Sequence, residues 1–313
     1  MKLERYFENS KILHVGCEEN RAYYIPFSES KNAIDLPREK SDRFISLNGE
    51  WKFKLYKNIY EHENLFEDWT GFDTIPVPSC WQNYGYDTHQ YTNIRYPFPF
   101  DPPYVPHDNP CGAYARTFDC DMSEDKYYLN FEGVDSCFYV WVNDEFVGYS
   151  QVSHCTSEFD ITDKLKKGTN KLYVLVLKWC DGSYLEDQDK FRMSGIFRDV
   201  YILARPENHV RDFFIKTSLN GAVSIELDGP DASIELYDKE ILLESAKSVN
   251  GRAELKIDNP KLWSAECPYL YDLVIKLYGE VIVQHIGFRE ISVNDGIVYV
   301  NGVKVKMFGI NRH

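Results

Sequence analysis

The chain has 313 residues, a length that predicts about two domains, and its 23 Tyr, 19 Phe and 6 Trp residues exclude wholesale disorder. The 35 basic and 49 acidic residues give a net charge of −14. This charge argues against nucleic acid as a partner, because an acidic surface repels phosphate backbones. An uncharged partner such as a neutral sugar stays open.

No apolar run approaches the roughly 20 residues that a membrane-crossing helix needs, so we expect no membrane partner. The N-terminal region has no apolar stretch followed by a small-residue cleavage site, which favours a cytoplasmic protein. The eight cysteines lie far apart, without a CxxC pair. Metal ribbons and redox dithiols need closely spaced thiols, so we expect reduced cysteines that pack as small hydrophobic residues.

Residues 1–41 show no sustained hydrophobic period, which predicts an irregular arm that packs on another surface. From residue 42 to 206 the pattern is that of β-structure. Trp51, Phe53 and Leu55 alternate with polar neighbours, and KYYLNFEGVDSCFYVWVNDEFVGYSQ predicts a meander of three strands. Further short strands are predicted in SEFDIT, LKKGTNKLYVLVLKW and GIFRDVYIL. Because no strong helical period interrupts them, we predict a β-sandwich.

Residues 69–110 are crowded with proline and aromatic residues. Proline lacks the N–H that a central strand needs, so this stretch is predicted to be mainly loop. Long ordered loops usually carry function, but a rigid cover over the sandwich is the other interpretation. Its aromatic and amide side chains suit a sugar ring, and they suit a hydrophobic core as well. These side chains are Trp81, Gln82, Asn83, Tyr84, Tyr86, Tyr91 and Asn93.

Residues 207–293 contain alternating hydrophobic pieces separated by turns, the last of them REISVN. About seven or eight strands in roughly 85 residues is the pattern of an Ig-like sandwich. Residues 294–313 predict a hairpin about Asn301-Gly302, followed by a strand VKMFGI.

The densest polar segment is DGSYLEDQDKFRMSGIFRDV, residues 181–200. Its carboxylates can bind a hard cation or act as an acid/base pair, and an extended chain would place Asp187 and Asp189 on one face. A surface loop in which arginines compensate the acids is the other interpretation. The chain has no HxH or HExxH spacing and no GxSxG, P-loop or GxGxxG motif, which argues against the reaction classes that depend on them.

The sequence resembles the N-terminal part of glycoside hydrolase family 2 enzymes, most closely the large microbial β-galactosidases. The matching stretches occur in the family's order and cover residues 45–313. They are SLNGEWKF, VPSCWQNYGYD, YTNIRYPFPFDPPYVPHDNP, FEGVDSCFYVWVNDEFVGYS, SEFDIT, DGSYLEDQDKFRMSGIFRDV, NPKLWSAECPYLY, IGFREI and GINRH.

The resemblance implies an all-β chain. A jelly-roll, galactose-binding-like β-sandwich (residues 42–206) precedes an Ig-like β-sandwich (207–293), and residues 294–313 begin a (β/α)₈ barrel. In the family the barrel carries two catalytic Glu residues that hydrolyse terminal, non-reducing β-D-galactosides such as lactose with retention. Because a barrel needs roughly 250 residues, we expect both carboxylates beyond His313 and an inactive 313-residue chain.

Four residues match functional positions of the family. Asn93 matches a residue that hydrogen-bonds substrate hydroxyls, and Asp189 matches one that holds a monovalent cation, Na⁺ or K⁺, and the sugar's hydroxymethyl group. Gln151 and Asp181 match positions near a peripheral Mg²⁺ site. The chain has Lys190-Phe191 where the family usually has Met-Trp, which is expected to leave room beside the monovalent ion. The resemblance also implies a homo-oligomer in which the N-terminal arm makes subunit contacts.

Two other functions stay open. The aromatic loop favours a free-standing carbohydrate-binding module without a hydrolytic partner. A relative acting on β-glucuronides or β-mannosides is the other possibility. The run SYLEDQD together with YTN disfavours it, because those relatives generally lack this ion-site loop.

Overall fold

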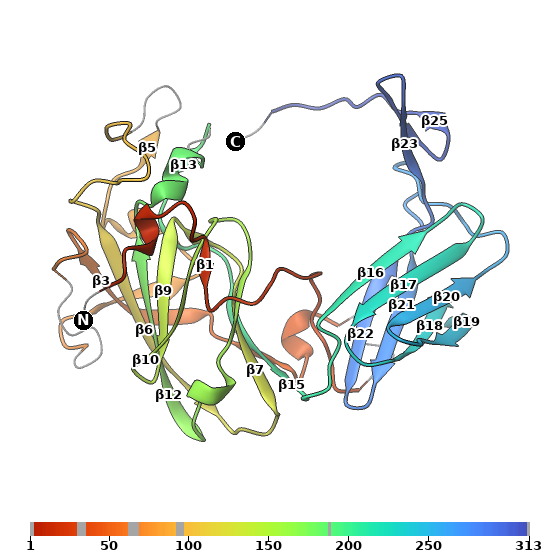
Figure 1. The fold of residues 1–313 in the computed structure, drawn as a ribbon, viewed down its shortest axis with the longest axis horizontal. Coiled ribbons are helices and arrows are strands. Elements are labelled where there is room, and N and C mark those ends of the chain that lie inside the picture. Colours follow the sequence, from red (N-terminus) through yellow and green to blue (C-terminus); the bar gives the residue numbers. More distant parts are fainter. Residues whose placement is uncertain (1–2, 30–35, 62–68, 92–96, 187–188, 312–313) are drawn as a thin grey trace. The chain divides into compact units, whose positions relative to one another are not determined.

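The computed structural model describes residues 3–29, 36–61, 69–91, 97–186 and 189–311, and these form an all-β fold (Figure 1). The helices among them are short 3-10 turns, namely η1 (Tyr6–Glu8), η3 (Arg38–Lys40), η4 (Trp81–Tyr84), η5 (Thr162–Lys164) and η6 (Asp181–Tyr184). The chain divides into two compact units. The first contains the residues up to Asn20 together with Ile45–Ala204, and the second contains Arg21–Phe44 and the chain from Arg205 onward.

The first unit is a sandwich of two sheets. The seven-stranded sheet has the order β1 (His14–Val15), β10 (Glu145–Gln151), β9 (Cys137–Val142), β12 (Gly168–Leu177), β6 (Cys111–Cys120), β3 (Gly49–Tyr56), β4 (Asp73–Val77). The four-stranded sheet has the order β11 (Ser157–Asp160), β7 (Lys126–Phe131), β15 (Val200–Arg205), β2 (Phe44–Ser46). The sequence prediction of a jelly-roll type β-sandwich is therefore confirmed at the level of fold class.

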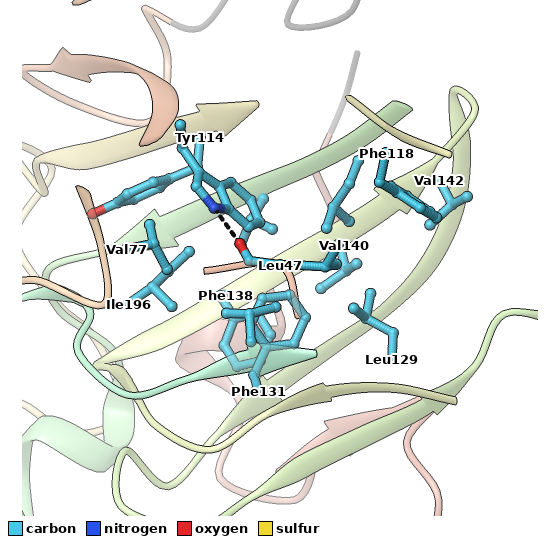
Figure 2. Close-up of a cluster of buried hydrophobic side chains, with 14 of the residues drawn as sticks. Leu47, Val77, Tyr114, Phe118, Leu129, Phe131, Phe138, Val140, Val142 and Ile196 are labelled. Atoms are coloured by element: carbon cyan, nitrogen blue, oxygen red, sulfur yellow. Dashed lines mark hydrogen bonds between the residues drawn. The ribbon is translucent and has the colours of Figure 1, made fainter. Parts of the chain in front are cut away.

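The core of this unit lies between the two sheets. Phe131 of β7 packs against Phe138 of β9, with ring centroids 4.9 Å apart, and Leu129 and Val140 are fully buried beside them (Figure 2). The indole Nε1 of Trp51 is also buried, and it donates a hydrogen bond of 2.8 Å to the carbonyl oxygen of Leu47. This bond is favourable because a buried N–H without a partner is costly. Within the described structure, the Nε1 of Trp81 is such an unpartnered group.

The large sheet is covered on its second face as well, so every residue of β9 is buried. The cover includes the N-terminal segment, in which Phe7 is 1% exposed and Tyr6 stacks on Tyr139 with ring centroids 6.1 Å apart. The irregular arm expected from the sequence thus packs on this sheet over its first part. Residues 21–29 and 36–44 belong to the second unit, where Tyr24 is buried and Phe27 forms a β-bridge with Val281.

The proline-rich stretch 69–110 contains more regular structure than predicted. β4 (Asp73–Val77) pairs with β3 and includes Pro76. The strand lies at the edge of the seven-stranded sheet, where a residue without an N–H is tolerated. Within the described part of the stretch, η4 and the two-residue strand β5 (Gln90–Tyr91) follow.

The second unit is an Ig-like sandwich of seven strands, in agreement with the sequence prediction. One sheet contains β16 (Asp212–Thr217), β17 (Ala222–Asp228) and β20 (Arg252–Lys256). The other has the order β19 (Ile241–Lys247), β18 (Ser233–Asp238), β21 (Tyr271–Leu277), β22 (Glu280–Ile286). Their alternating inward residues form one core, which includes Ile225, Leu236, Leu273 and Ile282.

A three-stranded meander follows, made of β23 (Ile291–Asn294), β24 (Ile297–Val300) and β25 (Val303–Lys304). The stretch REISVN, assigned by its pattern to the second β-domain, pairs with β24 instead. Asp295 and Gly296 have positive φ angles of 50° and 72°, which close a tight hairpin at that point. The predicted strand VKMFGI is not formed after Lys304 in the described residues, and Phe308 and Ile310 are exposed. The barrel itself stays a prediction.

Candidate functional site

Two segments about 100 residues apart meet at one end of the first unit. β5 pairs with β13 (Phe191–Arg192), with Tyr91 opposite Phe191 and Gln90 opposite Arg192 (Figure 1). The rings of Tyr91 and Phe191 lie 5.8 Å apart and are 52% and 60% exposed. The pairing therefore joins the aromatic loop to the acidic segment, which sequence spacing alone does not show.

Asp189 is exposed beside this pairing, and its carboxylate accepts a hydrogen bond from the Tyr91 hydroxyl. A carboxylate and a phenol oxygen are hard donors of the kind that Na⁺ and K⁺ bind, and both also hydrogen-bond sugar hydroxyls. Asn93, the other residue expected to bind substrate, lies outside the described residues, so its role stays a prediction. Asp187 lies outside them too, so the expected shared face with Asp189 is untested.

The segment that carries Asp189 is fixed to the sandwich by its charged neighbours. Glu186 accepts hydrogen bonds from the backbone N–H of Ser153 at 2.9 Å and from its hydroxyl at 2.6 Å. Arg192 Nη2 donates to the carbonyl oxygen of Ser183 at 2.6 Å. These contacts set the path of the backbone on both sides of Asp189.

Of the aromatic-loop residues, the structure separates those that a ligand can reach from those in the core. Trp81 is 0% exposed and packs on Phe53, and Gln82 is buried with its amide bound to Ser194. Of the two interpretations, Trp81 and Gln82 therefore follow the hydrophobic-core one, because the first turn of η4 points into the sandwich. Tyr84 is half exposed, and Tyr91 beside Asp189 is the described aromatic best placed for a sugar ring.

A second oxygen-rich site surrounds η6. Asp181 is buried, its Oδ1 accepts from the Gly182 N–H at 2.9 Å, and its Oδ2 has no hydrogen-bond partner within the described structure. Gln151 Oε1 lies 3.5 Å from the position that a Cβ on Gly182 would take, and it accepts a hydrogen bond from the Tyr149 hydroxyl at 3.3 Å. The Gln151 amide nitrogen is 3.5 Å from the Ile12 carbonyl oxygen. An orphaned carboxylate oxygen beside amide and carbonyl oxygens fits a hard cation such as Mg²⁺.

The electrostatics of this site depend on a residue that the sequence did not single out. Burial raises the pKa of Asp181, hydrogen bonds from the Gly182 N–H and the Gln151 side chain oppose this rise, and the carboxylate of Glu8 adds a smaller increase. Glu8 comes from η1, more than 170 residues away in sequence, and no local motif connects it with Asp181. No group of three or more His, Cys, Asp or Glu side chains in the described residues is arranged to hold a metal. A Mg²⁺ ion here would therefore keep several waters, as Mg²⁺ commonly does.

The second unit contains a cavity of about 510 Å³ beside β16 and β22. Trp263 forms one wall, and the guanidinium of Arg289 lies 4.7 Å from the centroid of its ring. His285, also in the lining, is bound to Asp272 at 2.9 Å. The hydroxyl of Thr217, another lining residue, donates to the Gly287 carbonyl oxygen at 2.9 Å, and sequence reasoning assigned this region no function.

Two general expectations can be compared with the structure. All eight cysteines lie in described residues, and they are unpaired thiols. Burial raises the pKa of Cys17 to about 12 and that of Cys80 to about 11. Among the described residues, the helices are all too short to reach across a bilayer.

The two sandwiches and the loop site define a class: a sugar-binding-type β-domain followed by an Ig-like β-domain. The family comparison gives the same division. The model described as "Glycosyl hydrolases family 2, sugar binding domain" matches residues 44–206, and that described as "Glycosyl hydrolases family 2" matches residues 208–289. The chain belongs to glycosyl hydrolases family 2.

The chain is similar to curated proteins named "Beta-galactosidase". One from Actinobacillus pleuropneumoniae is 48% identical over 325 residues, covering 100% of this chain and 32% of the relative. Another from Staphylococcus xylosus is 45% identical over 328 residues, covering 100% of this chain and 33% of the relative. The chain thus spans about a third of the length of these relatives.

Solved structures with the same fold are named as β-glucuronidases. One from an uncultured Clostridium sp. has a TM-score of 0.68 and 22% identity, covering 83% of this chain and 47% of that one. One from Faecalibacterium prausnitzii has a TM-score of 0.68 and 18% identity, covering 85% and 50%. At these identities the likeness shows the fold alone.

Proposed function

We propose that the protein containing this chain is a retaining β-galactosidase that hydrolyses terminal, non-reducing β-D-galactosides of the lactose type. The observation that carries the proposal is the 48% identity, along the entire chain, to the Actinobacillus pleuropneumoniae protein named "Beta-galactosidase". The catalytic Glu pair belongs to a barrel outside these 313 residues. This chain contributes one wall of the sugar site and supports the barrel.

In this proposal Asn93 and Asp189 bind substrate, and Asp189 also holds a Na⁺ or K⁺ ion. The ion would polarise the hydroxymethyl group of galactose, and the Tyr91 hydroxyl beside Asp189 keeps the carboxylate oriented. The supporting geometry is the β5–β13 pairing, which holds Tyr91 and Asp189 together at an exposed edge. The remaining ligands of the ion come from the rest of the protein.

Asp181 and Gln151 are proposed to hold a Mg²⁺ ion with a mainly structural effect. The unpartnered Asp181 Oδ2 would be a ligand of the ion. The positive charge of the ion would also reduce the repulsion between the carboxylates of Asp181 and Glu8. The ion would then tie η6 to η1. Removing Mg²⁺ with a chelator should lower the melting temperature of the 313-residue chain itself, whereas Asp181→Asn should abolish that dependence.

The competing substrate class is β-glucuronides, which the names of the structural neighbours suggest. A glucuronide carries a carboxylate where galactose carries a hydroxymethyl group. The galactoside is favoured because the two relatives named "Beta-galactosidase" are 48% and 45% identical along the whole chain, whereas the two β-glucuronidase structures are 22% and 18% identical. The complete purified protein, assayed with nitrophenyl β-galactoside and β-glucuronide side by side, distinguishes them. A higher kcat/KM for the glucuronide would refute the proposal.

A free-standing carbohydrate-binding module is the second alternative. The 313-residue chain is expected to bind galactose weakly or not at all, since it offers one wall of a pocket, and to show no hydrolysis. Calorimetry with millimolar galactose and a chromogenic assay of this chain test both statements. We further propose that the complete protein forms homo-oligomers and is cytoplasmic, where its unpaired cysteines stay reduced.

A further inference from the structure

The segment that presents Asp189 is attached to the sandwich by an ion pair that neither the family match nor the motif pattern assigns. Lys190 Nζ lies 3.6 Å from Asp135 Oδ2, and the two side chains are 28% and 8% exposed. Lys190 directly follows Asp189 in the chain. The contact therefore restrains the backbone next to Asp189.

Asp135 is a rigid anchor for this contact. It lies in β8 (Val134–Asp135), which pairs with β14 (Gly195–Ile196), and Asp135 is opposite Gly195 in that ladder. The neighbouring Ser136 N–H donates to the Leu177 carbonyl oxygen at 3.1 Å, which joins the end of β8 to β12. These two contacts fix the backbone that bears the Asp135 carboxylate, independently of its contact with Lys190.

The ion pair completes a set of three attachments along the segment. Glu186 is held by Ser153, Lys190 by Asp135, and Arg192 by the Ser183 carbonyl and the face of Trp179, whose ring centroid is 5.5 Å from the guanidinium. Asp189 lies between the attached residues Glu186 and Lys190, and its carboxylate accepts a hydrogen bond from Tyr91 at the surface. The attachments restrain the backbone while leaving the Asp189 side chain accessible.

Stability alone does not account for a buried acid at this position. Burial raises the pKa of Asp135 to about 6, although Lys190 and Arg192 lower it, so the ionised carboxylate is unfavourable in the folded chain. Buried ion pairs are often no more stabilising than apolar residues of the same size. A positioning role explains why the pair is present at a cost in stability.

We propose that Asp135 and Lys190 are positioning residues that hold the Asp189 carboxylate in place for its cation and sugar. The proposal rests on the proposed role of Asp189. The pair acts through the backbone of the 189–190 peptide and does not itself touch substrate or ion.

The first test measures the segment directly in the 313-residue chain, without any activity. Lys190→Met keeps the length of the side chain and removes its charge, Asp135→Asn keeps the shape of the anchor, and Lys190→Arg keeps the pair. Losing the pair should speed amide hydrogen exchange of residues 189–192 about fivefold in Lys190→Met and Asp135→Asn, whereas Lys190→Arg should leave it unchanged. Lys164→Met is the matched control, because it breaks an exposed Lys164–Glu145 pair of 2.6 Å in another part of the same unit.

The second test uses the complete protein and separates positioning from general destabilisation. Lys190→Met and Asp135→Asn should raise the half-saturating Na⁺ concentration about fivefold, with kcat at saturating Na⁺ within about twofold of wild type. The double variant should be no worse than either single variant, since both remove one interaction. Lys190→Arg should restore the Na⁺ response.

The outcomes distinguish this inference from the proposed function. Unchanged amide exchange of residues 189–192, or a fall in kcat with an unchanged Na⁺ response, would overturn the positioning role. If the wild-type complete protein does not hydrolyse β-galactosides, the proposed function is refuted. Faster amide exchange in Lys190→Met and Asp135→Asn would in that case still support the attachment of the segment by Asp135 and Lys190.

Discussion

The buried carboxyl of Asp135 gives the sharpest stability prediction for this chain. Burial raises its pKa from the ordinary value of 3.8 to about 6, with Glu186 raising it further and with Lys190 and Arg192 opposing. At pH 5 the folded chain therefore holds a proton that the unfolded chain has released. Stability must fall as the pH rises from about 4 to about 6, since folding then depends on keeping that proton.

The magnitude follows from the two pKa values. Their difference, at about 1.4 kcal/mol per pH unit, corresponds to about 3 kcal/mol once the pH is above 6. Asparagine has nearly the shape of the protonated acid and cannot ionise. We therefore expect Asp135→Asn to raise the free energy of unfolding of the first unit by up to about 3 kcal/mol at pH 7.5 and by little at pH 4.

Urea unfolding followed by tryptophan fluorescence measures this difference. Five of the six tryptophans (Trp51, Trp69, Trp81, Trp141 and Trp179) lie in the first unit, so the signal reports mainly on that unit. Asp121→Asn is the control of opposite sign, because hydrogen bonds from Ser123 lower the pKa of this exposed carboxyl. The reasoning fails if Asp135→Asn is no more stable than wild type at pH 7.5, or if its advantage does not shrink toward pH 4.

Three further changes have defined outcomes. Arg205→Met leaves Glu280, which is 0% exposed, without its ion-pair partner. Amide exchange of the second unit should therefore show a free energy of unfolding lower by about 3–5 kcal/mol, and replacing both Arg205 and Glu280 by apolar residues should cost less. Gly195→Ala adds a methyl within 2.8 Å of a backbone carbonyl at a φ of +129°, and thermal melting should reveal a loss of about 2–3 kcal/mol. When the native chain is titrated with a thiol reagent, the exposed Cys155 and Cys267 should react faster than the other six cysteines. If either of them reacts as slowly as the buried cysteines, the assigned exposure is wrong.

Alternation of hydrophobic and polar residues was sufficient to predict most strands. In β3 the pattern alone predicts that Trp51 and Phe53 point inward, because side chains of a strand alternate between its two faces. Strands β17 and β20 of the second unit follow for the same reason, since buried and more exposed residues alternate along them. Strand β19 does not, because its residues are exposed on both faces except for Ala246. Strand β9 was also predicted, but its burial on both faces needed the cover from Phe7 and Tyr6, which no local pattern encodes.

Predictions based on composition were less accurate where tertiary pairing decides the structure. Pro76 led to the prediction of a loop, but it lies in the edge strand β4. At the edge of a sheet, the N–H that proline lacks is not needed for pairing with a further strand. Trp81 and Gln82 have the composition of a sugar site, but η4 turns them into the sandwich. REISVN alternates like a strand of the second sandwich, and only the turn at Asp295 decides that its partner is β24.

For the site, the resemblance selected residues that the structure places in chemically suitable surroundings. Asp189 lies at the surface beside Tyr91, and Asp181 has an orphaned oxygen beside Gln151. Asp135 was not predicted, because its significance comes from Lys190, 55 residues away. A contact of that kind depends on how the strands are paired, and sequence spacing contains no direct signal of it.

The distribution of buried charge in the first unit separates what folding requires from what the site requires. The cluster between the sheets is made of aromatic and aliphatic side chains with Cys120, and it contains no carboxylate or ammonium group in the described residues. Among the described residues of the first unit, the buried charged side chains are Asp135, Glu158, Lys178, Asp181 and Arg192. Three of them, Asp135 on β8, Asp181 on η6 and Arg192 on β13, lie on elements next to the proposed cation sites. Apolar residues of similar size would stabilise these positions as well or better. We therefore explain the charges at Asp135, Asp181 and Arg192 by the geometry that they impose on Asp189 and the η6 oxygens, whereas Lys178 forms an ion pair of 2.5 Å with Asp87.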